Sequence, residues 1–526
     1  MLLGIDYGTT RTVVAAVDRG NYPVVSFQSD NGDPTEWYPS LIAYRRDGAE
    51  RCYGFEAAAR QNDPAWSLVR SFKRQLGALG PQSKVALNAN NPDAESPTAL
   101  QLLTEFLRQL RADLYERSNL LLRAGEPLEV TISVPANANS NQRYLTLDAF
   151  RRAGFTVKGT LNEPSAAGVE YAHHVSTARA RASREHVVVY DLGGGTFDAS
   201  VISMMDQQHE VIASDGIGRL GGDDFDEILL DLALTRAGSK QISADERLSL
   251  LEECREKKEG LHPNTRKIVV DLGRTLADAG AVLVSTADFY ERCQPLVEST
   301  IEAMELAMAR STRGAAIEWS SVAALYLVGG SSDLPAVART LRQRYGRLVR
   351  KSPYPHAATA IGAAIASDST AGYQLRERFT RHFGVWREAD DGRSITLDVI
   401  FAKETPLPAS GAQKLTSTRR YRPSHNVGHF RFLECSRIDE GGHPTSEITP
   451  WDEIYFPFVN ELQDKAQLSE IPVMRTQPGA QLIEELYSCD EHGIIEVQVI
   501  NHATQHQRSF MLHPPGSQAA KSTRSG

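Results

Sequence analysis

The stretch VVVYDLGGGTFDASVI, residues 187–202, interrupts a strand-like apolar pattern with two aspartates, three glycines and a threonine. Glycine has no side chain, so the backbone N–H groups of such a hairpin can approach a phosphate closely. Asp191 and Asp198 would repel a bare phosphate, and they suit the site only if a hydrated cation such as Mg²⁺ separates carboxylate from polyphosphate. The pattern therefore indicates metal and phosphate chemistry. The alternative is an ordinary glycine-rich hairpin whose aspartates cap the turn.

The same pattern occurs at the N-terminus. Residues 2–18, LLGIDYGTTRTVVAAVD, contain an apolar strand, Asp6, a turn that begins at Gly8, and a second apolar strand. A repeat at a separation of about 185 residues predicts two homologous lobes that face each other across a cleft. A third glycine turn, AALYLVGGSSDLPAV at 323–337, joins a strand pattern to a helical one and suits a further contact to a nucleotide.

Length and composition narrow the class of protein. A chain of 526 residues with 41% hydrophobic residues predicts three or four domains or subdomains with substantial cores. The formal net charge of −9 argues against nucleic acid as the main partner. The five cysteines show no CxxC spacing and are expected to be reduced thiols. With no signal peptide and no apolar run of membrane-spanning length, the expected location is cytoplasmic, without a membrane partner.

The pattern of the chain divides it into four parts. Residues 1–370 alternate strand and helix patterns, with a helical subdomain near 225–310. Residues 371–382 are expected to form a linker. Residues 383–513 are dominated by strand-like alternation in SITLDVIF, HFRFLE, EIYFPFV and GIIEVQVI, which predicts a β-sandwich. The tail, 514–526, has no apolar periodicity and is expected to be disordered.

Six motifs, given in chain order, carry a family resemblance: LGIDYGTT, TISVPANANSNQR, LNEPSAA, DLGGGTFD, EVIASDGIGRLGGDDFD and LVGGSSDLP. They resemble the ATPase domain of the seventy-kilodalton heat-shock chaperones, the DnaK-like family. The resemblance covers residues 1 to about 370 and implies an α/β actin-like ATPase fold, two ribonuclease-H-like lobes around an ATP cleft. Farther on, TPLP and CDEHGIIEVQV look like parts of the family's all-β, peptide-binding sandwich.

The resemblance implies a role for each matching residue. Lys73 matches the lysine that reaches the γ-phosphate and the attacking water, Glu163 the acid that helps to place metal and water, and Asp198 a water or proton partner. Asp6 and Asp191 match the carboxylates that hold hydrated Mg²⁺. Pro135 and Arg143 match the pair that relays the nucleotide state towards the peptide domain. Contacts to ATP or ADP are implied for Gly8, Thr9, Thr10, Gly193, Gly194, Gly195, Thr196, Gly221, Gly222, Lys258, Gly329, Gly330 and Ser331.

The sequence also departs from the family pattern. Glu259 and Asp333 stand where members commonly carry the basic side chains that sandwich adenine, and carboxylates cannot stack in that way. Arg255 and His262 replace the usual acid and serine of the adenosine pocket. These changes predict weaker ATP binding than is typical of the family.

Three further departures concern the peptide domain and the partners. Gly159 stands where bacterial members carry an arginine that J-domain co-chaperones use. The segment QLRERFTRHFGVW replaces the acidic and hydrophobic linker, so we expect no docking of the linker on the ATPase domain and weak coupling to the peptide domain. We also expect the helical lid to be missing, with fast exchange of bound peptide.

The resemblance favours a slow ATPase, an ATP-dependent chaperone that regulates the binding of unfolded or extended polypeptide. A J-domain co-chaperone and a nucleotide exchange factor are partners that it implies. Two alternatives stay open: a nucleotide-switched binding or signalling module with little turnover, and a small-molecule kinase of the same superfold.

Overall fold

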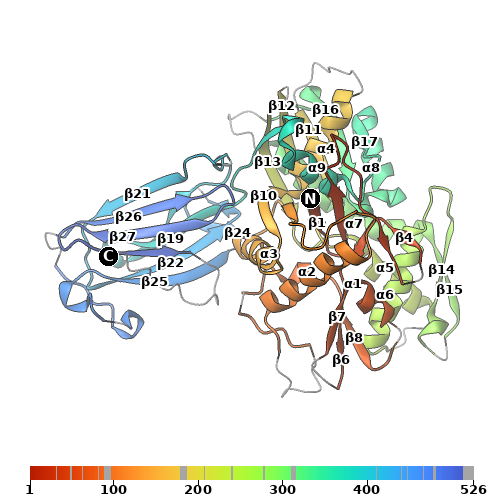
Figure 1. Ribbon diagram of the computed structural model, residues 1–526, viewed down its shortest axis with the longest axis horizontal. Coiled ribbons are helices and arrows are strands. Elements are labelled where there is room, and N and C mark those ends of the chain that lie inside the picture. Colours follow the sequence, from red (N-terminus) through yellow and green to blue (C-terminus); the bar gives the residue numbers. More distant parts are fainter. Residues whose placement is uncertain are drawn as a thin grey trace.

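The computed structural model (Figure 1) describes residues 1–30, 32–47, 50–61, 63–80, 82–87, 96–177, 186–205, 208–238, 241–276, 279–309, 316–409, 411–439, 441–446, 448–465, 467–477 and 481–512. The tail that the sequence predicts to be disordered, 514–526, lies outside these residues. All five cysteines are buried free thiols. Among the residues described, no helix combines the length and apolar character that crossing a bilayer requires.

The first hairpin forms the centre of a five-stranded sheet of order β10-β9-β1-β2-β5. Its strands are β1 (Leu2–Tyr7), β2 (Arg11–Ala16), β5 (Tyr38–Pro39), β9 (Glu129–Val134) and β10 (Thr156–Asn162). β1 and β2 are antiparallel, whereas β9 runs parallel to both β1 and β10. Asp6 lies at the end of β1, and the chain turns at Gly8 before β2 begins.

The second hairpin forms the centre of a six-stranded sheet of order β17-β16-β11-β12-β13-β18. Its strands are β11 (His186–Leu192), β12 (Phe197–Met205), β13 (Gln208–Ile217), β16 (Val322–Val328), β17 (Val349–Lys351) and β18 (Gln374–Arg376). β11 and β12 are antiparallel, and β16 runs parallel to β11 and β17. The order and directions of β17-β16-β11-β12 repeat those of β10-β9-β1-β2, as the repeated sequence pattern predicts.

Two helices that are rich in small residues, α4 (Glu163–Thr177) and α9 (Ala358–Ser367), pack against each other and against the sheets. A Cβ on Gly362 of α9 would lie 1.8 Å from the carbonyl oxygen of Ala166 in α4. A Cβ on Gly4 of β1 would lie 2.2 Å from the carbonyl oxygen of Ala360. Glycine at both positions therefore allows α9 to approach α4 and β1 at backbone contact distance.

The remaining elements of residues 1–162 surround the first sheet. They are β3 (Phe27–Gln28), β4 (Pro34–Thr35), β6 (Ile42–Arg45), β7 (Arg51–Tyr53), α1 (Gly54–Ala59), β8 (Trp66–Val69), η1 (Phe72–Gln75), α2 (Ala99–Glu116) and α3 (Ser140–Arg152). α2 starts at a capping box in which the Thr98 side chain accepts from the Gln101 backbone N–H. Its buried leucines and Phe106 pack into the core of this lobe.

The region predicted to be a helical subdomain contains α5 (Gly222–Arg236), α6 (Ala244–Glu259), η2 (Leu272–Arg274), α7 (Thr286–Ala309) and a hairpin of β14 (Lys267–Asp271) and β15 (Ala281–Ser285). Then follow η3 (Trp319–Ser321), η4 (Gly330–Asp333), α8 (Pro335–Tyr345), η5 (Gly346–Leu348) and, after α9, η6 (Ser369–Ala371). α5, α6 and α7 share one buried hydrophobic cluster with the second sheet. This cluster holds α5 and α6 against the second sheet.

Residues 382–512 form two four-stranded antiparallel sheets that project from the rest of the chain (Figure 1). One sheet contains β19 (His382–Ala389), β20 (Ser394–Phe401), β22 (Val427–Cys435) and β25 (Thr449–Pro457). The other contains β21 (Leu415–Tyr421), β26 (Ile483–Cys489), β27 (Ile495–Asn501) and β28 (His506–Met511). Short elements are β23 (Arg437–Ile438), β24 (Pro444–Ser446), η7 (Asp390–Gly392), η8 (Asn460–Leu462) and η9 (Leu468–Glu470). The four predicted strand segments correspond to β20, β22, β25 and β27.

Charged residues join the two sheets of this sandwich. The fully buried carboxylate of Glu485 in β26 receives two hydrogen bonds from Arg387 in β19, at 2.8 and 2.5 Å. The hydroxyls of Tyr421 and Tyr487 also donate to it. Because every donor points at the same carboxylate, the burial of this charge is compensated, and the sheets are held in one relative position.

The segment that joins the second sheet to the sandwich contradicts one expectation from the sequence. We expected no docking of QLRERFTRHFGVW on the ATPase domain, but Gln374–Arg376 form β18, which pairs in parallel with β13 of the second sheet. Arg378 also donates to Glu210 of β13 at 2.5 Å. Backbone pairing at a sheet edge needs no particular side chains, so the lack of an acidic and hydrophobic motif did not exclude it.

The contact of α4 with α9 leads to a prediction about stability. In Gly362→Ala the new methyl group must push the two helices apart, and overpacking of this kind costs about 1–3 kcal/mol. We expect a lower thermal unfolding temperature by differential scanning fluorimetry. Gly280→Ala is the matched control, because a Cβ there has nothing within 4 Å. Equal unfolding temperatures for the two variants would contradict the close α4–α9 packing.

Candidate functional site

A cavity of about 1000 Å³ lies where the two hairpins and the third glycine turn meet. Most predicted site residues line it: Asp6, Gly8, Thr9, Thr10, Lys73, Glu163, Asp191, Gly193, Gly194, Thr196, Gly222, Lys258, Gly329, Gly330 and Ser331. The residues come from β1, η1, α4, β11, α5, α6 and η4, so both lobes contribute. Gly195, Gly221 and Asp198 are not part of this lining.

The glycines let the turns approach one another. A Cβ on Gly194 would lie 2.8 Å from Cγ2 of Thr10 in the other hairpin, and one on Gly222 would lie 2.5 Å from Oγ of Ser331. Gly329 has a φ of 81°, a left-handed conformation that favours glycine. The backbone of three separate turns is thereby brought to one cavity, as a polyphosphate site requires.

Lys73 and Glu163 form a buried ion pair at 2.5 Å in the floor of the cavity. Burial lowers the pKa of Lys73, but the carboxylates of Glu163 and Asp6 outweigh this effect, and the net shift is upward. Burial raises the pKa of Glu163 to about 7, although Lys73 acts in the opposite direction. Lys73 therefore carries its charge at neutral pH and is positioned by its contact with Glu163.

The carboxylates of the cavity exceed the cationic charge beside them. Burial, followed by the charges of Glu163 and Asp6, raises the pKa of Asp191 well above its usual value. Asp6 accepts a hydrogen bond from the Ser133 hydroxyl at 2.8 Å. A bound divalent cation would stabilise the ionised forms of these acids, so Asp6 and Asp191 fit a Mg²⁺ site. Among the described residues no group of three or more acidic, histidine or cysteine side chains is placed to hold a metal directly.

Asp198 lies beside the carboxylates of the site but outside the cavity lining. The sequence suggested a water or proton partner in the site, but Asp198 is 2% exposed, lies outside the cavity lining and accepts a hydrogen bond from the backbone N–H of Asn137 at 3.0 Å. Asp198 lies directly opposite Asp191 in the β11–β12 hairpin, so both side chains are on the same face of the sheet. Burial, followed by the charge of Glu163, raises the pKa of Asp198 well above its usual value. Its contact joins the turn after β9 to the second hairpin.

The two acids at the expected adenine-stacking positions are neutralised by basic partners. Glu259 pairs with Arg11 of β2 at 2.6 Å, and Asp333 pairs with Lys351 of β17 at 2.7 Å. Arg11 also lies over the ring of Trp37, 4.7 Å from its centroid. The region therefore carries paired opposite charges where the family pattern has basic residues, and neither acid is available to stack on a base.

Lys258 and Arg255 are occupied as well. Lys258 donates to the carbonyl oxygen of Gly222 at 2.6 Å and pairs with Asp226 at 2.7 Å. Arg255 contacts carboxylates of Asp223, Asp226 and Glu252. If Lys258 contacted the ribose of a nucleotide, its ammonium group would have to do so alongside its contacts with Gly222 and Asp226.

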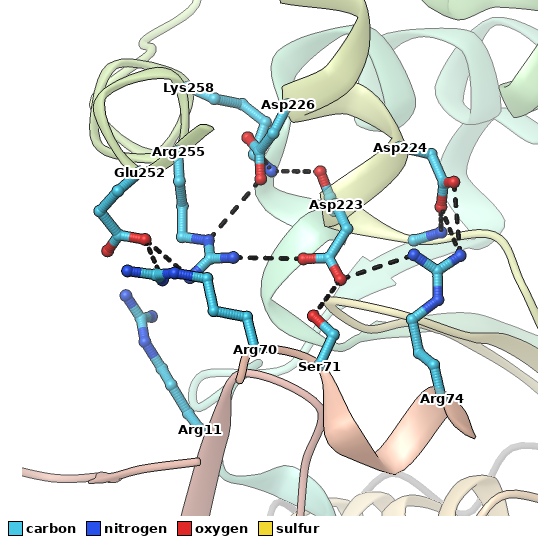
Figure 2. A network of polar contacts seen from close by, with 12 residues as sticks. Arg11, Arg70, Ser71, Arg74, Asp223, Asp224, Asp226, Glu252, Arg255 and Lys258 are labelled. Atoms are coloured by element: carbon cyan, nitrogen blue, oxygen red, sulfur yellow. Dashed lines mark hydrogen bonds and ion pairs between the residues drawn. The ribbon is translucent and has the colours of Figure 1, made fainter. Parts of the chain in front are cut away.

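A network of charges joins the lobes at the side of the cleft (Figure 2). Arg70 pairs with Glu252 of α6, and the Ser71 hydroxyl donates to Asp223 of α5 at 2.5 Å. Arg74 pairs with Asp224 at 3.1 Å. No short motif marks these residues, because the partners are 150–182 residues apart and meet only in the folded chain.

A polar path leads from the cavity side of the first lobe to the linker. Arg143 of α3 donates to Oδ1 of Asn162 at 2.5 Å. The backbone and side-chain nitrogens of Asn162 donate to Glu377 at 2.8 and 2.5 Å. Pro135 accepts from the backbone N–H of Ala138 in the turn before α3. Arg143, one of the two residues predicted to relay the nucleotide state, is thus linked through Asn162 to the segment that leads into the sandwich.

The cross-lobe network leads to a prediction about opening of the cleft. Arg70→Ala removes the first-lobe partner of Glu252, and a charged hydrogen bond contributes about 1.5–3 kcal/mol. A loss of about 1.4 kcal/mol raises the population of an opened form about tenfold. We expect faster amide hydrogen exchange in α5, α6 and β8. Arg292→Ala is the matched control, because its exposed pair with Asp231 lies within one lobe. Unchanged exchange in Arg70→Ala would contradict a closing role.

Comparisons with known proteins agree on a family. A family model described as Hsp70 protein matches residues 2–379. A chaperone protein HscA homolog of Burkholderia multivorans is 32% identical over 382 residues, 71% of this chain and 59% of the relative. A chaperone protein HscA homolog of Polynucleobacter necessarius is 31% identical over 440 residues, 79% of this chain and 66% of the relative. This chain thus matches between 59% and 66% of the length of these relatives. Because the family model matches well over half of the chain, the chain belongs to the Hsp70 family.

Proposed function

We propose that this chain is an ATP-dependent molecular chaperone of the Hsp70 type, which hydrolyses ATP to ADP and phosphate slowly and thereby regulates the binding of unfolded or extended polypeptide. The observation that carries the proposal is the cavity into which both hairpins bring glycine turns and hydroxyls around Lys73, Asp6 and Asp191. We also propose the actin-like fold for residues 1–370, which the repeated sheet order supports, and a separate sandwich domain for 383–513.

The chain's own groups suit phosphoryl transfer to water. Hydroxyls of Thr9, Thr10 and Thr196 are donors for phosphate oxygens. N–H groups of the glycine turns are further donors, except those of Gly8, Gly193, Gly222 and Gly329, which donate to backbone carbonyls. The ammonium of Lys73, held at 2.5 Å by Glu163, would contact the transferring phosphate and orient the attacking water. Asp6 and Asp191 would hold hydrated Mg²⁺, which neutralises charge on the phosphates when bound.

The sandwich and its connection support the chaperone part of the proposal. β18 attaches the linker to the second sheet, and Glu377 ties it to Asn162 at the end of β10. A change in the relative position of the lobes would therefore act on a segment that leads directly into β19. The partners proposed are extended polypeptide, a J-domain co-chaperone and a nucleotide exchange factor. Five buried free thiols support a reducing compartment such as the cytoplasm.

The first functional prediction concerns hydrolysis. We expect Mg²⁺-dependent ATPase activity, lost on chelation of the metal. Lys73→Ala should lower kcat by about 100-fold or more, because it removes a positioned donor to the reacting phosphate. The affinity for ATP, measured by calorimetry, should change far less, because Lys73 acts on the transferring group.

Lys267→Ala is the control for this measurement, because Lys267 is an exposed residue of β14 outside the cavity lining. Undiminished hydrolysis in Lys73→Ala would overturn the assignment of the site. ATP binding without hydrolysis in the unmodified chain would favour a nucleotide-switched module instead.

A second functional prediction concerns coupling between nucleotide and peptide. Glu377→Ala removes the acceptor that joins the linker to Asn162. The ratio of peptide affinities in ADP and in ATP should fall at least fivefold, a coupling loss of about 1 kcal/mol. Fluorescence anisotropy of a labelled apolar peptide measures both affinities. Glu388→Ala is the control, because its ion pair with Arg475 lies within the sandwich. An unchanged ratio would show that the signal bypasses this contact.

A further inference from the structure

The cavity has a second region, formed by α7 and α8. Pro335, Ala338, Arg339 and Arg342 line it from α8. Their spacing of three and four residues places them on one face of that helix. Tyr290 of α7 lines the same cavity. These residues come from different elements than the glycine turns and hydroxyls that suit a polyphosphate.

Arg339 presents a cationic group there that is held by an aromatic ring. Its guanidinium carbon lies 5.5 Å from the ring centroid of Tyr290. The side chain is exposed, and within the described parts of the chain no ion pair of Arg339 is found. A guanidinium that rests on one aromatic face keeps its second face free for another planar group.

Three other basic side chains of the cavity lining, Arg11, Lys351 and Arg255, are neutralised. Arg11 pairs with Glu259, and Lys351 pairs with Asp333. Arg255 is held by carboxylates from α5 and α6. Stacking on a flat ligand group by one of these three would require an ion pair to break, whereas stacking by Arg339 would not.

We propose that Arg339 stacks on the nucleobase of the bound nucleotide, with the Tyr290 ring as its positioning residue. The inference rests on the proposed function, since it needs a nucleotide in the cavity. A planar guanidinium binds the face of any purine, so the contact supplies affinity for the ring system and does not read the base edge. ATP and GTP should therefore gain from it equally.

Calorimetry of the Mg²⁺ complexes of ATP, GTP and tripolyphosphate tests the proposal on the full chain. Arg339→Gln should weaken ATP and GTP binding by about three- to thirtyfold, the range of one cation–π contact. Tripolyphosphate has no base, so its affinity should stay unchanged. Arg342→Gln is the matched control, because it removes the same charge from the same helix face, and no aromatic partner of Arg342 is found in the described residues.

Two variants of Tyr290 separate the ring from the hydroxyl. The hydroxyl oxygen is buried and has no hydrogen-bond partner within the described residues, so Tyr290→Phe should bind ATP like the unmodified chain. Tyr290→Leu removes the ring that positions Arg339 and should weaken ATP binding without affecting tripolyphosphate. Thermal unfolding without nucleotide checks that both variants fold.

The outcomes distinguish this inference from the proposed function. An ATP affinity that Arg339→Gln leaves unchanged would overturn the stacking role alone. An equal loss for ATP and tripolyphosphate, or an equal effect of Arg342→Gln, would overturn it too, because the charge would then act on the phosphates. If the unmodified chain binds ATP no more tightly than tripolyphosphate, this inference fails. If it binds neither ligand, the proposed function fails with it.

Discussion

The ammonium group of Lys73 lies among carboxylates from both lobes, and this balance of buried charge constrains the rest of the structure. Glu163 at the start of α4, Asp6 at the end of β1 and Asp191 near the end of β11 all act on it electrostatically. Burying such a group of acids is costly unless cations compensate them. The two hairpins must therefore be held at a fixed separation, close enough for their acids to share one lysine. The tight α4–α9 contact and the glycine turns provide that separation.

Charge compensation also organises the periphery of the cleft. Where the sequence carries Glu259 and Asp333, the structure supplies Arg11 and Lys351 as partners from β2 and β17. At the side of the cleft, acids of α5 and α6 are likewise contacted by Arg70, Ser71 and Arg74. A region that would repel a polyphosphate if its acids were unpaired is thereby made close to neutral. Salt would screen the exposed Arg11–Glu259 and Lys351–Asp333 pairs more than the largely buried Arg70–Glu252 pair.

The linker links this electrostatic core to the sandwich through two kinds of contact. β18 uses backbone hydrogen bonds to β13, which fix its position but depend little on sequence. Glu377 uses a buried carboxylate, which accepts from the backbone and the side chain of Asn162. Arg143 of α3 donates to the same asparagine, so α3 is connected through Asn162 and Glu377 to the segment just before β19. Glu485 and Arg387 fix the two sheets of the sandwich relative to each other.

The sequence by itself determined the two glycine-turn hairpins and several strands of the sandwich. Its repeated Asp–Gly–Thr turns identified both hairpins, and alternation of apolar residues located β20, β22, β25 and β27, because these signals are written in neighbouring residues. Only the tertiary structure decided which distant groups meet. It placed Asp198 outside the cavity, docked the linker as β18, paired Glu259 with Arg11, and set Arg339 on Tyr290. Each of these contacts joins residues that are far apart in the chain or depends on which face of an element points inward, and no local pattern encodes either.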